Sequence, residues 1–272
     1  MRDRNGRSFF MTAFEMAQVT YVAAVRSIRS GHRSALFAIG RNILMGAVLV
    51  LSFFLLFQMI GQRIPKLRGD FMLFLISGVF LYITHIRTVA AVAGAGNPLS
   101  PMLMHAPVNT FILITSGALS ALYTQFVTMA SVLGIYHLFW TPITIDQPAQ
   151  AVMMFLLAWF SGVAVGTVFL ALNPWIPEVS QIVQMIYRRA NMIASGKMFV
   201  ANTLPAGMLA MFDWNPLFHI IDQSRGFTFL HYNPHFSSVA YPVFVSLGVL
   251  VVGLMGEFVT RRSVSVSWMA GR

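Results

Sequence analysis

Long apolar stretches alternate with short polar segments along most of this chain. A helix needs roughly 20 mostly apolar residues to cross a bilayer. The third stretch is one long helix, because LYTQF (122–126) at its middle has no glycine or proline to turn the chain. The pattern predicts six membrane-spanning helices, at about 42–60, 71–93, 109–139, 149–172, 178–201 and 238–260.

A helical periodicity precedes the first span, over residues 9–30. Thr12, Glu15 and Gln18 interrupt it, whereas the core of a signal peptide is continuously apolar. We therefore predict an amphipathic helix in the membrane interface, in preference to a cleaved signal. Its apolar positions are Phe10, Phe14, Ala17, Tyr21, Val25 and Ile28.

The apolar segment 202–236, between the last two spans, is broken. Pro205 can open one short helix, Asn215 and Pro216 have the residue types of a helix start, and Gly226 is a candidate stop. Each piece is too short to cross a bilayer, which predicts a re-entrant segment. Such irregular backbone occurs at membrane depth where it is buried in protein or lines a water-filled cavity, so we expect it to line a path.

The loop between the second and third spans encodes a further short helix, over 101–106. Ser100 and Pro101 are typical of a helix start, and Pro107 limits its continuation. The helix would present Met102, Leu103 and Met104. It is either a docking surface for a partner or a helix that packs under its own bundle.

Composition agrees with a lipid environment. Of the 272 residues, 57% are hydrophobic and 10% charged, against about 25% charged in soluble domains. No repeat or linker divides the chain, so residues 1–272 form a single all-α integral membrane domain. The absence of cysteine excludes disulfides, thiolate metal sites and a cysteine nucleophile. The net charge of +10 does not indicate nucleic-acid binding, because no basic stretch is long enough to form a groove.

The arginines predict the orientation of the chain. They are concentrated in the N-terminal 41 residues and at the C-terminus, which places both ends in the cytoplasm. The loop 61–70, with Arg63, Lys66 and Arg68, disagrees but is outnumbered.

Motifs for catalysis and for metal or nucleotide binding are missing from the sequence. ASGKMF resembles the end of a phosphate-binding loop, but Asn191 replaces its first glycine and Met198 its magnesium ligand. The histidines are scattered and the eight carboxylates dispersed, so we expect neither a bound cofactor nor an enzyme.

Arg188, Arg189 and Lys197 stand out because they lie inside a predicted span. A charge at mid-bilayer costs about 3 kcal/mol or more unless it faces water or a partner. Together with His85 and Arg87 in the second span they suggest a hydrated conduit, with Arg188 and Lys197 facing an anionic polymer. The alternative is that they pair with groups such as Glu178 or backbone carbonyls and hold the helix in place.

Two weaker signals have two interpretations each. GVAVG (162–166) permits close helix approach, either within the chain or between two copies. The aromatic residues around the broken segment form either an interfacial belt or a stacking surface for sugar rings. They are Phe212, Trp214, Phe218, Phe227, Phe229, Tyr232 and Phe236.

The stretch PEVSQIVQMIYRRANMIASGKMF, followed by LP and WNPLFHIIDQSRG, resembles the membrane subunit of ABC-2 type polysaccharide exporters, in particular the capsule-export permeases. About a third of the chain carries this likeness. Lys197 departs from the residue usual in that family. The matching residues are Pro177, Glu178, Arg188, Ser195, Pro205, Asn215, Pro216, Leu217, Asp222 and Arg225.

The resemblance implies a homodimer in the bacterial inner membrane, with two cytoplasmic ABC ATPase subunits that bind ATP and magnesium. It assigns energy coupling to the loop helix at 101–106, through Ser100, Pro101, Met102, Leu103 and Met104. It also implies a gate at Pro205, Asn215, Pro216, Asp222 and Arg225. Periplasmic and outer-membrane export partners are also implied. The substrate path is expected at Arg87, Arg188, Lys197, Trp214, Phe218 and Tyr232.

Other functions remain as alternatives. An ABC-2 permease for O-antigen, another glycolipid or a drug would share the fold. An intramembrane transferase would need clustered acid and base residues, and a passive channel would need no coupling helix.

Overall fold

The computed structural model describes residues 18–22, 24–25, 35–60, 70–96 and 110–270. All regular secondary structure within these ranges is helical. The predicted interfacial helix at 9–30 lies mostly outside them, although residues 18–22 and 24–25 are helical.

Five of the described helices are long and apolar enough to cross a membrane. They confirm the class predicted from the sequence, and α4 is one unbroken helix as expected. Their bounds are Ala35–Ile60 (α2), Phe71–Ala93 (α3), Thr110–Phe139 (α4), Pro148–Leu172 (α5) and Ala240–Ala270 (α9).

The helix expected at 178–201 differs from these five. It spans Pro177–Ala194 (α6) and ends well before residue 201. It is too polar to qualify as a membrane span by composition. Pro177 occupies its first turn, where the N–H group that proline lacks would have no partner within the helix.

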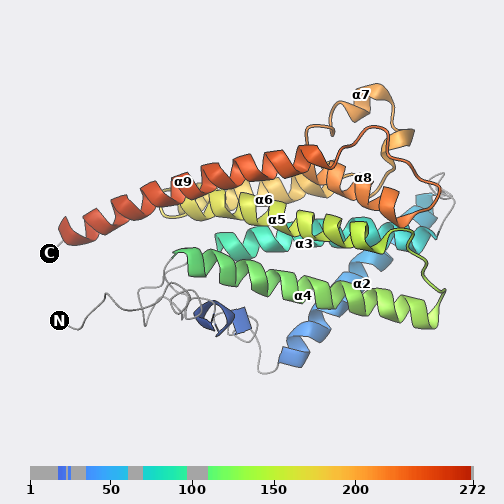
Figure 1. The fold of residues 1–272 in the computed structure, drawn as a ribbon, viewed down its shortest axis with the longest axis horizontal. Helices are drawn as coiled ribbons and strands as arrows, with labels where there is room; N and C mark the ends of the chain where they lie inside the picture. Colours follow the sequence, from blue (N-terminus) through green and yellow to red (C-terminus); the bar gives the residue numbers. More distant parts are fainter. Residues whose placement is uncertain (1–17, 23, 26–34, 61–69, 97–109, 271–272) are drawn as a thin grey trace.

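Helices α3, α4, α5, α6 and α9 lie side by side along the long axis of the molecule, and α2 crosses them obliquely (Figure 1). Helix α5 packs against both α3 and α9. A Cβ built on Gly162 would lie 2.7 Å from the His85 carbonyl oxygen of α3, and one on Gly166 would lie 2.8 Å from Val92 Cβ. GVAVG therefore provides close packing within the chain.

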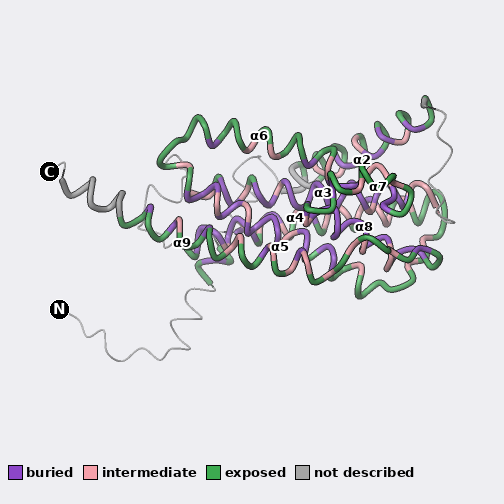
Figure 2. Tube along the Cα trace, turned by 90° about the horizontal axis from the view of Figure 1, so that it is seen from above, coloured by how far each residue is buried: buried purple, intermediate pink, exposed green. Residues whose placement is uncertain are grey.

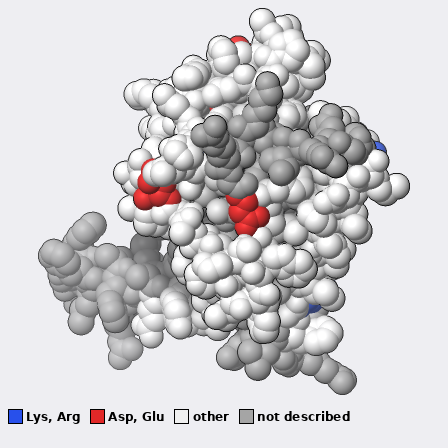
Figure 3. Space-filling view, turned by 90° about the vertical axis from the view of Figure 1, so that its right-hand side faces the viewer, with Lys and Arg blue, Asp and Glu red and all other residues white. Residues whose placement is uncertain are grey.

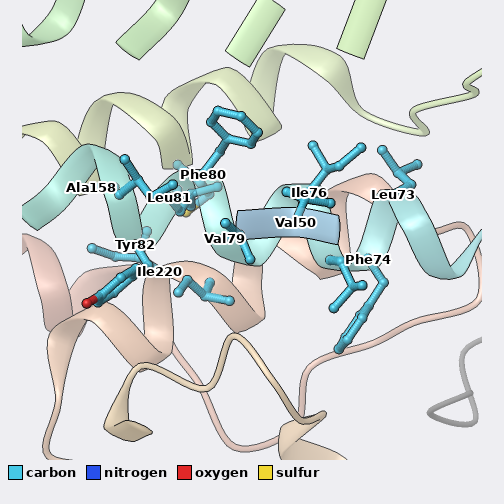
Figure 4. Close-up of a cluster of buried hydrophobic side chains, with 14 of the residues drawn as sticks. Val50, Leu73, Phe74, Ile76, Val79, Phe80, Leu81, Tyr82, Ala158 and Ile220 are labelled. Atoms are coloured by element: carbon cyan, nitrogen blue, oxygen red, sulfur yellow. The ribbon is translucent and has the colours of Figure 1, made fainter. Parts of the chain in front are cut away.

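The main apolar core lies around α3. Phe74, Val79 and Phe80 are almost fully buried there, beside Ala158 of α5 and Ile220 further along the chain (Figure 4). Asp70 caps the start of α3 by accepting from the Met72 N–H at 2.9 Å.

The segment after α6 is broken, as predicted. It contains a 3₁₀ turn at Ala201–Thr203 (η1), a short helix Ala206–Leu209 (α7) and a helix Pro216–Thr228 (α8). Asn215 caps α8 by accepting from the Leu217 N–H at 3.0 Å, and Pro216 occupies the first turn. The stop expected at Gly226 is wrong, because α8 continues to Thr228.

Helix α6 lies alongside α9, and hydrogen bonds link the two regions near both ends of α6. At its start, the Trp175 indole donates to Thr260 Oγ1 at 2.7 Å. At its end, the Ala194 carbonyl accepts from Asn215 at 3.0 Å, next to Trp214, whose carbonyl accepts from Tyr241 at 2.7 Å. Its 18 residues span about 27 Å, close to the roughly 30 Å of a bilayer core.

The loop after α4 meets the end of α8 at one end of the bundle (Figure 1). The N–H of Gln147, before α5, donates to the Phe227 carbonyl of α8 at 2.9 Å. On the visible face of this end, acidic side chains appear in separate spots and basic ones only at the margins (Figure 3).

Candidate functional site

The α6 helix has three faces with different chemistry, and only one of them faces the bundle. That inner face is polar, and its side chains are at least half-buried. It consists of Ser180, Gln184, Tyr187 and Asn191, spaced three or four residues apart as one side of a helix requires. We call these four side chains the polar row.

The polar row is hydrogen-bonded along its whole length. Ser180 Oγ donates to Asn173 Oδ1 at 2.6 Å, and the Gln184 amide approaches the same oxygen at 3.3 Å. At the other end, Asn215 Nδ2 donates to Asn191 Oδ1 at 3.1 Å. These bonds join α6 to the loop before it and to α8.

His85 of α3 holds the middle of the polar row. Its Nδ1 lies 2.8 Å from Ser161 Oγ and its Nε2 lies 2.8 Å from the Tyr187 hydroxyl. Ser161 donates to the Ala158 carbonyl at 2.9 Å, so its oxygen accepts from Nδ1–H. Nε2 then accepts from Tyr187, and a neutral imidazole satisfies both contacts. His85, which was expected to contribute to a conduit, therefore makes its hydrogen bonds within the bundle.

A second face of α6 is polar and exposed. Glu178, Gln181, Arg188 and Arg189 lie on it, and within the described residues no ion pair forms with either arginine. Met185 and Met192 lie among them, about half-exposed. We call this face the polar flank.

The third face is apolar and also exposed, as the course of α6 at the edge of the bundle shows (Figure 2). We call it the apolar flank. It consists of Val179, Ile182, Val183, Ile186 and Ile193.

A small cavity of about 10 Å³, the space of one water molecule, lies between α3 and α6. Gln184, Tyr187 and Arg188 line it from α6. Ile86, Val89 and Ala90 line it from α3. The cavity thus lies where the polar row and the polar flank meet.

Arg225 of α8 binds the turn that follows α6. Its guanidinium donates to the carbonyl oxygens of Gly196 (2.8 Å), Lys197 (2.7 Å) and Phe199 (2.6 Å), and it lies over the Phe74 ring at 3.9 Å. Burial lowers the pKa of Arg225 to about 10, and the Asp222 carboxylate opposes that shift. We call this contact the Arg225 clamp.

Lys197 lies within the Arg225 clamp and is 1% exposed. Its ammonium donates to the Met192 carbonyl and sits 3.9 Å from the centre of the Tyr82 ring, with Phe53 at 5.4 Å. Lys197 therefore faces the protein interior in this structure and does not lie with Arg188 on one surface. This arrangement matches the alternative in which backbone carbonyls hold the cation.

Arg87 also lies apart from the polar flank. It is half-buried, and its Nη1 donates to Asn42 Oδ1 of α2 at 2.5 Å. The contact places it on the side of α3 that faces α2, away from α6.

The aromatic residues of the broken segment do not form one exposed surface. Phe212, Phe218 and Tyr232 are buried, and only Trp214 and Phe236 are largely exposed. Phe218 packs in an apolar cluster with Phe212. A continuous sugar-stacking platform is therefore not present on the described residues of this segment.

Tyr232 and Asp222 fasten the chain that leaves α8. Asp222 accepts from the Tyr232 hydroxyl and from Ser237 Oγ, the latter at 2.6 Å. Burial raises the pKa of the Tyr232 hydroxyl, and the neighbouring Asp222 carboxylate raises it further.

Some of the residues that carry the family resemblance lie together at the end of α6, whereas Pro177 and Glu178 lie at its start. Asn215 joins α6 to α8, and Arg225 forms the clamp. Ser195 is fully buried beside them, and its hydroxyl has no hydrogen-bond partner among the described residues. Pro205 directly precedes α7. Sequence reasoning missed the polar row, although its spacing of three and four residues was a visible signal.

Two further predictions concern the coupling segment and metal binding. The coupling segment Ser100, Pro101, Met102, Leu103 and Met104 lies outside the described residues. Within the described ranges, no group of three or more His, Asp or Glu side chains could hold a metal ion.

No known protein-family model matches the sequence, and no curated protein matches it. A function is therefore inferred from the residues of the chain and from the geometry described above.

Proposed function

We propose that this chain is the permease subunit of an ATP-driven exporter that moves an acidic, capsular polysaccharide across the bacterial inner membrane. It works as a homodimer with six crossings per subunit, both termini in the cytoplasm, and two separate ABC ATPase subunits. The resemblance over residues 177–225 motivates the class of protein.

The polar flank of α6 is the observation that carries the proposal. Arg188 and Arg189 are exposed about two-thirds of the way along a helix that runs the length of the bundle. Each would cost about 3 kcal/mol or more if it faced lipid. The flank therefore adjoins water or a second subunit, while the apolar flank suits lipid. A helix between lipid and water forms the wall of a hydrated path.

The chemistry of the flank favours a polar, anionic cargo. Among the described residues Arg188 forms no ion pair, and an exposed guanidinium of this kind binds carboxylates in a bidentate manner. Gln181 adds an amide that hydrogen-bonds sugar hydroxyls. A path for a lipid or an apolar drug would not need the polar side chains of this flank, so the glycan exporter is preferred over the lipid or drug permease.

The experiment has a biochemical and a functional arm. A tagged chain should co-purify with an ABC ATPase from membranes. Arg188→Gln should reduce polymer export about tenfold or more at unchanged membrane level, because one charge-assisted contact is worth about 1.5–3 kcal/mol. Arg188→Lys should retain part of the export.

A control is Arg262→Gln, which removes an exposed arginine of α9 that lies outside the polar flank and should leave export unchanged. Normal export by Arg188→Gln would show that Arg188 makes no essential contact with the polymer. Absence of any co-purifying ATPase would count against the whole proposal.

A further inference from the structure

Hydrogen bonds, rather than apolar packing, attach α6 to the bundle. Only Tyr187 and Ala194 of this helix pack against the described apolar clusters. The aliphatic side chains of its apolar flank are 44–65% exposed. Helices α3 and α5, by contrast, are in close contact at Gly162 and Gly166, where there is no room for a Cβ atom. Of the helices along the bundle, α6 is therefore held differently from its neighbours.

The contacts of the polar row can be exchanged one for one with hydroxyl groups. Ser180, Gln184, Tyr187 and Asn191 are all uncharged donors and acceptors, and the neutral His85 adds one more. A sugar hydroxyl both donates and accepts, so it can replace each of these partners without leaving a buried polar group unpaired.

The end of α6 provides a fixed point. Gly196 follows the helix with φ of +74°, which glycine adopts without strain. The Arg225 clamp holds this turn through the carbonyls of Gly196, Lys197 and Phe199 at 2.6–2.8 Å. A Cβ on Gly78 of α3 would lie only 3.1 Å from the Lys197 backbone, so the clamp is also packed tightly against α3.

The cavity between α3 and α6 connects the two polar faces. It is lined by Gln184 of the polar row and by Arg188 of the polar flank. A chain travelling along the flank would meet the polar row at this cavity first.

We propose that α6 is a movable wall that turns about the Arg225 clamp, and that the polar row behind it is a second binding surface, for the hydroxyls of a sugar chain. The inference rests on the proposed export function. Movement of α6 away from α3 breaks the Tyr187–His85 hydrogen bond and opens the seam from the cavity toward Ser180.

Cysteine labelling tests the movement without requiring export. Labelling is specific to the introduced site, because the chain has no native cysteine. Ser180 in the polar row and Ser246 in α9 are each 2% exposed, so Ser246→Cys is a matched control. In native membranes, Ser180→Cys should react with a small water-soluble methanethiosulfonate at least about tenfold faster than Ser246→Cys, as expected for local opening. Tyr187→Phe should accelerate the reaction of Ser180→Cys further. Equal protection of both cysteines would overturn the proposal.

Cross-linking tests whether the movement serves export. Ala90→Cys with Gln184→Cys, joined by a short bifunctional thiol reagent with a reducible link, fixes α6 to α3 across the cavity. Export should fall to background and recover on reduction. The control pair, Ala171→Cys with Gly256→Cys, joins α5 to α9, where a Cβ on Gly256 would lie 3.2 Å from Ala171 Cβ. That cross-link should leave export intact.

The outcomes separate the two proposals. Export that persists when α6 is fixed to α3 overturns the movable wall and leaves the exporter standing. A native chain that supports no polymer export overturns the proposed function, and the labelling result still decides whether α6 moves.

Discussion

Arg225 and Lys197 stabilise the same turn from opposite sides. Arg225 donates to the Lys197 carbonyl, while the Lys197 ammonium reaches back to the carbonyl of Met192. Carbonyl oxygens and aromatic ring faces attract both buried cations, and the Asp222 carboxylate adds to this at Arg225. Lys197 and Arg225 therefore have structural partners, whereas Arg188 and Arg189 are exposed.

Gly78 should not tolerate a side chain. A Cβ there would lie 2.8 Å from Arg225 Nη2 and 3.1 Å from the Lys197 backbone oxygen. Since backbone cannot yield as a side-chain tip can, we expect Gly78→Ala to cost about 1–3 kcal/mol, read as a lower melting temperature of the detergent-solubilised protein.

The control for this prediction is Gly134→Ala in α4, where a Cβ meets nothing within 4 Å. Alanine is favoured over glycine in a helix by about 1 kcal/mol, so this variant should be neutral or more stable. Equal loss of stability in both variants would contradict the role of the close contact.

Lys197→Met tests the structural role of the buried ammonium. Methionine fills similar space but leaves the Met192 carbonyl without its donor, at a cost of about 1–3 kcal/mol. We expect reduced membrane level and thermal stability. Normal stability with loss of export would instead return Lys197 to the path.

The residue-scale predictions from sequence succeeded where a local rule applied. The Asn215 cap and Pro216 start are set by neighbouring atoms, and both were found. Gly226 misled because glycine only permits a stop; here a Cβ would meet Pro234 at 2.7 Å, so the position needs a small residue for packing. The aromatic partners of Lys197, Phe53 and Tyr82, come from α2 and α3, which no local pattern identifies.

At the scale of elements, hydrophobicity identified the five helices that are long and apolar enough to cross a membrane, and α3, with bounds of Phe71–Ala93, matches its predicted range. It was a poorer guide to α6, which pairs polar groups inward and ends at Ala194. The shape of the broken segment followed from its prolines. Its burial did not, because the packing of Phe218 depends on how the chain folds back to bring residues such as Ala201 and Phe212 against it.

The two flanks of α6 should respond oppositely to the same charge. Val183 lies on the apolar flank and Gln181 on the polar flank, both exposed. Val183→Lys should reduce the amount of inserted protein, because a lysine facing lipid costs about 3 kcal/mol. Gln181→Lys should be inserted normally. Quantitative immunoblots of washed membranes give the comparison, and equal tolerance would mean that neither flank faces lipid.

For the whole molecule, the loop segment at 100–104 remains the predicted contact with the ATPase. Leu103→Asp with Met104→Asp should release the ATPase during purification while the permease stays inserted, because charges disrupt an apolar docking surface. Thr144→Asp is the control, since Thr144 is exposed in the loop after α4, at the opposite end of that helix. Retained binding and export in the double variant would contradict the coupling role.

The polarity of α6 also bears on biogenesis. A helix with Glu178, Arg188 and Arg189 gains little by leaving the translocon for lipid on its own. The hydrogen bonds from Ser180 to Asn173 and from Trp175 to Thr260 tie its entry to α5 and to α9. Because α9 follows α6 in the chain, the partner at Thr260 exists only after α6 has been synthesised. We therefore expect α6 to take its final position after α9 has been made, and a truncation before α9 should leave α5 inserted with α6 outside the bilayer.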